Sequence, residues 1–523
     1  MTNSLDKLKQ IDDKQNIRFG VILSYMGMAV SILGALFVSN KVLDFLGDYN
    51  YGLYSFVTSI TTWLTVVSNA LNASFLRYAT QEAVNNKGNV GRTNSIYFRM
   101  LSILGLGVVV IGCAVLGILY ASHTCIGKYD WNDSRLMYLL FAISILNIGL
   151  TMPASIFSLY VTYRKKFVFA KAAAIIVSVI TFAGQFLLAY FTRSIVAIAA
   201  FTVVITIVRY CGNSYFCRRY LNINFAKVSL KENRQLIHSI CIFSGILLFN
   251  SIVDQINSNV DKTLLGIFST PEDVTLYQMA HQLSATFTTF SVSVSGVFAP
   301  TAHELVARRN TAGINRLYLK ISSVQSVILC CVAFGFLSCG RNFIIWWIGE
   351  ERVTSYYVAA ALMLVSTGPL TMNSSIEIQR AEDRHLFRAV VYFALALANV
   401  LLSILFLKLF DSEYAIYACL AGTVITTICS HWIAMNIYNR KVIGLPVGKY
   451  LMALTEYMLF GLVGYVAVLI CNRLFINDIK SIELSFLVQG TVFLAVYMLI
   501  VLTVNRKQVK DVMDGIKGRR CKS

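Results

Sequence analysis

A row of hydroxyl and amide side chains runs along the second long apolar stretch of the sequence. Its members recur at intervals of three and four residues, so they share one face of a helix. Within lipid, such a face must contact protein or water. The row is therefore suited to hydrogen bonding a hydroxyl-rich ligand such as a sugar, and ordinary bonding between helices is the alternative explanation. Its members are Tyr51, Tyr54, Ser55, Thr58, Thr61, Thr62, Thr65, Ser68, Asn69 and Asn72.

A second polar row occupies the eighth apolar stretch and has the same helical spacing. The two rows lie on the second apolar stretch of each half of the chain. This placement favours two walls of a hydrated cavity over isolated contacts between helices. The second row consists of Gln278, Gln282, Thr286, Thr289 and Ser293.

The seventh apolar stretch carries an acid, Asp254, with Asn250 and Asn257 on the same face. A carboxylate within the membrane is costly and marks a functional site by default. Asp254 can bind a proton or a sodium ion that couples to a second process, with the two amides as neutral oxygen donors. Structural pairing with a neighbouring cation is the alternative.

Four cations at the inner ends of apolar stretches are candidates for binding an anion: Arg18, Arg77, Arg99 and Lys320. The planar guanidinium of arginine donates two parallel hydrogen bonds to phosphate. Anchoring of helix ends at the membrane surface is the competing role for all four. Arg77 is the strongest candidate because it continues the first polar row.

The elements that position these residues are membrane-spanning helices. The chain has 523 residues, of which 57% are apolar and only 14% are charged, against roughly 25% charged in soluble domains. Apolar segments of about 20 residues, the length that crosses a bilayer as a helix, recur along the whole chain. The expected fold is all-α and integral to the membrane, with about fourteen spans at 18–40, 51–76, 96–119, 136–160, 167–190, 195–216, 238–261, 274–299, 317–339, 355–377, 387–409, 414–437, 449–471 and 484–504.

The net charge of +19 is a topology signal. Most Lys and Arg residues lie in the two tails and in the alternate loops on the same side, which places both termini in the cytoplasm. Anionic lipid is the expected partner of this surface, and nucleic acid is not. The twelve cysteines lack the spacing of a metal site or a disulfide framework, so we expect neither a metal nor another cofactor beyond a coupling proton or sodium ion.

An internal repeat divides the chain. Leu150-Thr151-Met152 recurs as Leu370-Thr371-Met372, and weaker matches keep the same order. Six spans per repeat give both halves one orientation, as in transporters with parallel repeats. We therefore expect a lobe at 1–235 (helices 1–6), a second at 236–440 (helices 7–12), and a trailing part at 441–523 with helices 13–14 and a basic cytoplasmic tail.

Three motifs resemble a known family. The stretch LDFLGDYNYGLYSF at 43–56 resembles the LG…GLY signature of polysaccharide and O-antigen flippases of the Wzx type. The same is true of VDKTLLGIFSTPEDVTLYQMAHQL at 260–283 and of WIGEE at 347–351. These flippases belong to the superfamily that includes the multidrug (MATE) exporters and the lipid II flippases, and the resemblance covers spans one to twelve.

The resemblance implies a MATE-like transporter of the bacterial inner membrane, not an enzyme. Its expected cargo is an undecaprenyl-diphosphate-linked oligosaccharide, an O-antigen or capsule repeat unit, moved to the periplasmic face by alternating access. The polymerase and chain-length machinery of polysaccharide biosynthesis are further implied partners. Few cations lie deep in the outer half of the bundle, which leaves the diphosphate site open.

Two other function classes compete with this reading. A multidrug or cation antiporter would need acids and aromatic side chains for cationic drugs, whereas the cations at the inner ends favour an anionic cargo. A membrane-embedded glycan polymerase or ligase would need catalytic loops, and the longest expected outer loop, at 120–135, shows no acid–base pair or metal motif in Asp130 and Asp133.

Overall fold

The computed structural model describes residues 2–85, 89–126, 129–229, 233–296, 298–382, 384, 386–476 and 481–504. Within these ranges the chain is almost entirely helical, as the apolar composition predicts, since only helices and closed barrels satisfy the backbone in lipid. The long helices are α1 (Thr2–Thr61), α2 (Val66–Asn85), α3 (Gly91–Ala121), α4 (Trp131–Tyr163), α5 (Phe167–Thr192), α6 (Ile195–Arg219), α7 (Arg234–Phe268), α8 (Pro271–Gly296), α10 (Thr311–Ile348), α11 (Thr354–Thr371), α13 (Leu386–Leu409), α14 (Ala415–Thr427), α16 (Val447–Cys471) and α17 (Ile482–Val504).

Shorter elements complete the chain. The 3-10 helices are η1 (Thr62–Thr65), η2 (Glu350–Arg352) and η3 (Ser412–Tyr414), and the π-helices are η4 (Ile428–Met435), η5 (Asn439–Ile443) and η6 (Asn472–Ile476). The short α-helices are α9 (Ala299–Ala307), α12 (Asn373–Ala381) and α15 (Asn436–Tyr438).

The span prediction is confirmed in outline. Eleven helices among the described residues are long and apolar enough to cross a membrane. One of them, Leu23–Val84, holds two predicted spans, because α1 breaks at Gly47, where φ is 77° and ψ is 161°. The polar α8 and the shorter α11 coincide with the predicted spans 274–299 and 355–377. The protein is therefore a multi-pass membrane protein.

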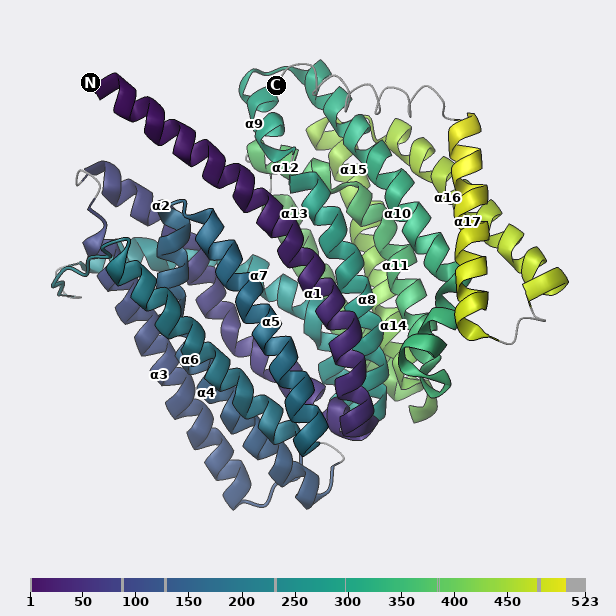
Figure 1. The fold of residues 1–523 in the computed structure, drawn as a ribbon, viewed down its shortest axis with the longest axis horizontal. Helices are drawn as coiled ribbons and strands as arrows, with labels where there is room; N and C mark the ends of the chain where they lie inside the picture. The colour runs from purple at the N-terminus through teal and green to yellow at the C-terminus, as the bar shows by residue number, and fades with distance from the viewer. Residues whose placement is uncertain are drawn as a thin grey trace. The chain divides into compact units, whose positions relative to one another are not determined.

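The described residues form two compact units, one of residues 2–275 with 407–415 and one of residues 276–406 with 416–504. In the first unit α1 packs beside α5, α3 beside α4, and α2 beside α7 (Figure 1). In this grouping α7 lies with the first unit, whereas the predicted boundary between the lobes falls at 235/236. Whether the lobes move along that boundary stays a prediction.

Each unit has its own core. Phe75, Tyr97 and Ile156 are fully buried at the centre of the first core, and Tyr318 and Tyr450 belong to the core of the second. Tyr97 and Tyr318 pair in the predicted sequence repeat, and both have no exposed surface. The predicted repeat thus matches a buried tyrosine of one unit with a buried tyrosine of the other.

The trailing helices α16 and α17 pack against α10 in the second unit (Figure 1). Phe493 of α17 is buried where α10 and α16 carry glycines. A Cβ at Gly335 would lie 3.2 Å from its ring, and one at Gly464 would lie 2.9 Å away. The two glycines therefore make the socket for this aromatic ring, which fixes α17 onto the unit.

Candidate functional site

The signature glycines build a joint in the first unit. A Cβ at Gly52 would lie 1.8 Å from the carbonyl oxygen of Pro271, and one at Gly266 would lie 1.9 Å from the ring of Phe56. The positive φ at Gly47 is also a conformation that favours glycine. The motif residues at these positions therefore hold the break in α1 against α7 and the start of α8.

The hydroxyls after this joint first bond their own helix. Thr58 donates to the carbonyls of Tyr54 and Ser55 at 3.0 Å, and Thr65 donates to Thr62 at 2.7 Å. Such bonds back to the preceding turn bend helices, and here α1 passes into the 3-10 segment η1. Each hydroxyl that donates in this way keeps lone pairs. These threonine hydroxyls are therefore hydrogen-bond acceptors, and that of Thr65 already accepts from the amide of Asn69 at 3.4 Å.

Neighbouring helices bond this row from both sides. Gln255 of α7 donates to the hydroxyl of Thr62 at 2.7 Å, and Ser155 of α4 donates to the side-chain oxygen of Asn72 at 3.0 Å. Thr58, Thr65 and Asn72 are half-buried, and Asn69 is exposed. We call this assembly of Thr58, Thr62, Thr65, Asn69 and Asn72 the threonine row. It is anchored by protein contacts and still accessible.

Asp254 and Asn257 lie one turn apart on α7, and both are exposed. Asn250 lies in the same helix, but its side chain is outside the described part. An ionised carboxylate at the centre of a bilayer costs at least about 2.5 kcal/mol. The exposed face of α7 is therefore expected to contact water or a polar ligand, not hydrocarbon.

Arg77 lies two turns beyond Asn69 on α2 and is exposed. Its guanidinium carbon is 4.2 Å from the centre of the Phe243 ring of α7. This distance is that of a cation–π contact, and a guanidinium also has N–H groups in its plane that can donate to an anion. A hollow of about 860 Å³ lies beside it, lined by Ala73, Leu76, Arg77, Thr80, Gln81 and Val84.

The other predicted cations have different surroundings. Arg99 donates to the backbone carbonyl of Val228, which ties the segment after α6 to α3. Lys320 is exposed on α10 of the second unit. The side chain of Arg18 lies outside the described part. Of these four residues, only Arg77 lies on the same helix as the end of the threonine row.

The second predicted row lies on α8 beside a buried polar contact. Gln278 and Gln282 on α8 are half-buried. Further along α8, Ser291 is buried and donates to the carbonyl of Leu370 at 3.1 Å, while Gln325 and Asn373 both donate to the Ser291 hydroxyl. Ser291 does not belong to the predicted row, and it makes a closed polar contact beside it. Thr289 of the row is exposed, and the side chain of Ser293 lies outside the described part.

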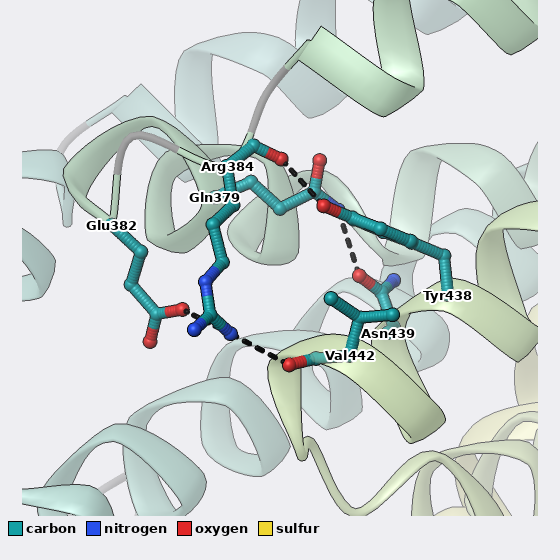
Figure 2. Close-up of polar contacts among 6 residues, drawn as sticks. All are labelled: Gln379, Glu382, Arg384, Tyr438, Asn439 and Val442. Carbon is teal, nitrogen blue, oxygen red and sulfur yellow. Dashed lines mark hydrogen bonds and ion pairs between the residues drawn. The ribbon is translucent and has the colours of Figure 1, made fainter.

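A second polar cluster in this unit joins α12 to the π-helical stretch. Tyr438 donates to the carbonyl of Arg384 at 2.9 Å, and Arg384 donates to the carbonyl of Val442 at 2.7 Å. Figure 2 shows both contacts. Gln379 and Asn439 are fully buried and bond each other at 2.7 Å (Figure 2). Because these donors bond acceptors of their own unit, the cluster serves as a structural joint.

The sequence analysis missed two members of the site, Gln255 and Phe243. An amide within an apolar stretch was a signal for Gln255, but it lies on a different face of α7 from Asp254. Phe243 gave no signal in the sequence, because a phenylalanine is common in a membrane span. Only its contact with Arg77 gives it a role.

The comparisons with known proteins agree with this architecture. Residues 44–356 match the model of a family described as polysaccharide biosynthesis protein. No curated protein matches the chain. A solved structure of the lipid II flippase MurJ in an inward closed conformation is similar, with a TM-score of 0.70 and 14% identity over 94% of this chain and 100% of that one.

Two further solved structures share the fold. An inward-facing multidrug resistance MATE family transporter of the MOP superfamily has a TM-score of 0.58 and 11% identity, over 84% of this chain and 95% of that one. A MOP superfamily transporter from Pyrococcus furiosus has a TM-score of 0.52 and 13% identity, over 87% and 96%. The predicted MATE-like fold is confirmed.

Proposed function

The chain belongs to the polysaccharide biosynthesis protein family, and from this premise we propose that it is a flippase for a lipid-linked oligosaccharide. The proposed cargo is an undecaprenyl-diphosphate-linked repeat unit of O-antigen, capsule or exopolysaccharide, carried from the cytoplasmic to the periplasmic face of the bacterial inner membrane. The observation that carries the proposal is the threonine row, a set of accessible acceptors in the middle of a membrane-spanning helix.

The chemistry of the row suits a glycan. A sugar hydroxyl that leaves water without a new partner costs several kcal/mol in hydrocarbon. The hydroxyls of Thr58 and Thr65 already donate to their own helix, so they can accept from sugar hydroxyls without leaving a donor unmatched. The row therefore offers a path on which a glycan exchanges water for protein bonds.

Arg77 is the proposed contact for the diphosphate. It is exposed, it lies beside a hollow of about 860 Å³, and its guanidinium carbon lies 4.2 Å from the centre of the Phe243 ring. Charge-assisted hydrogen bonds to phosphate are about twice as strong as neutral ones. We propose alternating access by rocking of residues 1–235 against 236–440, with both termini in the cytoplasm and with polymerase and chain-length proteins acting on the delivered product.

Asp254 is the proposed coupling residue, with Asn257 and Asn250 as neutral donors for a proton or a sodium ion. Its exposed position on a spanning helix supports this role, since a purely structural acid would be expected inside the packing. The same carboxylate would suit a cationic drug, so a multidrug antiporter is the second candidate.

One experiment distinguishes the oligosaccharide flippase from the multidrug antiporter. The full chain is reconstituted in liposomes with a fluorescent undecaprenyl-diphosphate disaccharide, and flipping is followed by an impermeant quencher, with ethidium efflux measured in parallel. We expect flipping of the disaccharide at least tenfold above protein-free liposomes and no ethidium efflux. Ethidium efflux without flipping would replace the proposal by the antiporter.

A further inference from the structure

A third polar row lies on α4 of the first unit. Its members follow one another at intervals of three and four residues, so they share one face of the helix. Each member is half-buried or exposed, and within lipid such a face contacts water or another polar group. We call this set the α4 row, and it consists of Ser144, Asn147, Thr151, Ser155 and Ser158.

The packing of α4 places this row beside the threonine row. A Cβ at Gly105 of α3 would lie 2.5 Å from the carbonyl oxygen of Gly149, so α3 covers that side of α4. Gly149 follows Asn147 by two positions, which is about 200° around a helix, and the α4 row therefore lies on the other side. There α4 packs against η1 and α2, and Ser155 donates to the side-chain oxygen of Asn72 at 3.0 Å.

The second unit covers the residues that the predicted repeat pairs with this row. Thr371 bonds the hydroxyl of Tyr450 of α16 at 2.8 Å, and Ser375 accepts from the amide of Asn439 at 3.1 Å. Both residues are buried, whereas Thr151 of the α4 row is exposed. The α4 row thus keeps accessible surface that its pairs in the second unit lose to protein contacts.

Asn147 is the member of the row with an unmatched hydrogen-bonding atom. Its Oδ1 is buried and has no hydrogen-bond partner within the described part of the chain. Asn147 lies eleven residues into the predicted span 136–160, which is about 16 Å along a helix and near the middle of a hydrocarbon core about 30 Å thick. Buried polar atoms in native proteins are nearly always bonded to protein, water or a ligand. The amide at this depth therefore calls for a polar partner.

The hydroxyls around Asn147 cannot replace its amide. Thr58, Thr65 and Thr151 each donate to a backbone carbonyl of their own segment, so they are acceptors for a ligand. A carbonyl group on a ligand needs a donor, which these hydroxyls have already used. Asn147 has two N–H donors and a carbonyl acceptor, and rotation about its last torsion presents either edge of the amide. An amide substituent on a sugar matches both edges at once.

We infer that Asn147 binds the acetamido group of an N-acetylated sugar in the head group of the cargo. The inference rests on the proposed function and extends it by naming the sugar class that the first unit selects. The N–H of the acetamido group donates to Oδ1 of Asn147, and Nδ2 of Asn147 donates to the acetamido carbonyl. The threonine row accepts from the sugar hydroxyls.

Two probes that differ in one substituent test this inference. They are fluorescent undecaprenyl diphosphates that carry either N-acetylglucosamine or glucose. Binding to the full chain in detergent and flipping in liposomes are measured for each probe. We expect the parent protein to bind the acetamido probe about fivefold more tightly than the glucose probe. Asn147→Leu should lose this preference and bind the glucose probe within about twofold of the parent protein.

The matched control is Asn213→Leu. Asn213 of α6 is also an amide in a span, and it donates to Ser158 of the α4 row at 2.9 Å. This variant should keep the preference for the acetamido probe. If Asn147→Leu does not fold, Asn147→Thr replaces it, because threonine keeps a polar side chain and removes the amide. Equal binding of the two probes by the parent protein, or a preference that survives at position 147 without the amide, would overturn the inference.

The same measurements separate this inference from the proposed function. Binding that prefers the acetamido probe and depends on Asn147, without flipping of either probe, would keep the inference and remove the flippase function. Flipping of both probes without any preference in binding would do the reverse. Binding of neither probe would remove both.

Discussion

One threonine from each unit shows the same side chain used in opposite ways. In the first unit, Thr65 bonds its own helix and stays half-exposed. In the second, Thr371 is fully buried and bonds the hydroxyl of Tyr450 at 2.8 Å. One arrangement leaves acceptors accessible for a ligand, and the other fixes helices together. Under the proposed function, an accessible threonine such as Thr65 belongs to the substrate path, whereas a buried one such as Thr371 joins helices.

The predicted repeat pairs Thr371 with a threonine of the first unit, Thr151, whose surroundings differ. Thr151 and Thr371 occupy equivalent positions in the matched sequences, yet Thr151 is exposed and donates to the carbonyl of Asn147 at 2.8 Å. The contact of Thr371 depends on Tyr450 of α16, which belongs to the trailing helix pair. The second unit therefore uses a polar group that its counterpart leaves on the surface.

The largest expected effect concerns Asp254, the acid on the seventh apolar stretch. Asp254→Asn should abolish accumulation driven by a pH or sodium gradient, because the amide cannot take up a proton and lacks the negative charge that attracts sodium. Gradient-driven uptake of the labelled glycan in liposomes measures this. Asp44→Asn is the control, since Asp44 is an exposed acid of the same unit paired with Lys41. Full coupling in Asp254→Asn would remove this residue from the ion site.

A smaller effect is expected from reversing the charge at the end of the threonine row. Arg77→Glu should lower the flipping rate of the diphosphate-linked glycan about tenfold, which corresponds to roughly 1.4 kcal/mol. The flipping rate of Arg77→Lys should lie between those of the parent protein and of Arg77→Glu, because lysine keeps the positive charge but lacks the planar guanidinium. The matched control is Arg209→Glu, an exposed arginine of α6. Equal rates in Arg77→Glu and the parent protein would exclude Arg77 as the diphosphate contact.

The smallest effects compare the two threonines directly by the same substitution. Thr371→Val should lower the free energy of unfolding by about 0.6–1 kcal/mol, because it removes a buried bond to Tyr450, and should leave transport unchanged. Thr65→Val should leave stability within about 0.5 kcal/mol and slow flipping a few-fold, because an acceptor is lost from the path. Thermal unfolding in detergent measures stability, and the liposome assay measures flipping. Loss of stability in Thr65→Val together with slower flipping in Thr371→Val would contradict the distinction between the two threonines.

Gly47 and Gly52 show what can and cannot be predicted from the sequence alone. The LG…GLY pattern identified the family correctly, because sequence signatures record local backbone demands such as the positive φ at Gly47. It did not reveal that Gly52 faces Pro271, more than two hundred residues away. That contact depends on how α1 and α8 meet, and no local pattern encodes it.

The sequence by itself determined the membrane-spanning helices and the spacing of the polar rows, because hydropathy and a 3.6-residue period are properties of single helices. The tertiary structure decided which rows are accessible, which partner holds each polar group, and that α7 packs with α1 and α2. It also placed the α4 row beside the threonine row. These features arise from contacts between helices distant in the chain, where a few ångströms of packing determine whether a hydroxyl meets a ligand or a neighbouring side chain.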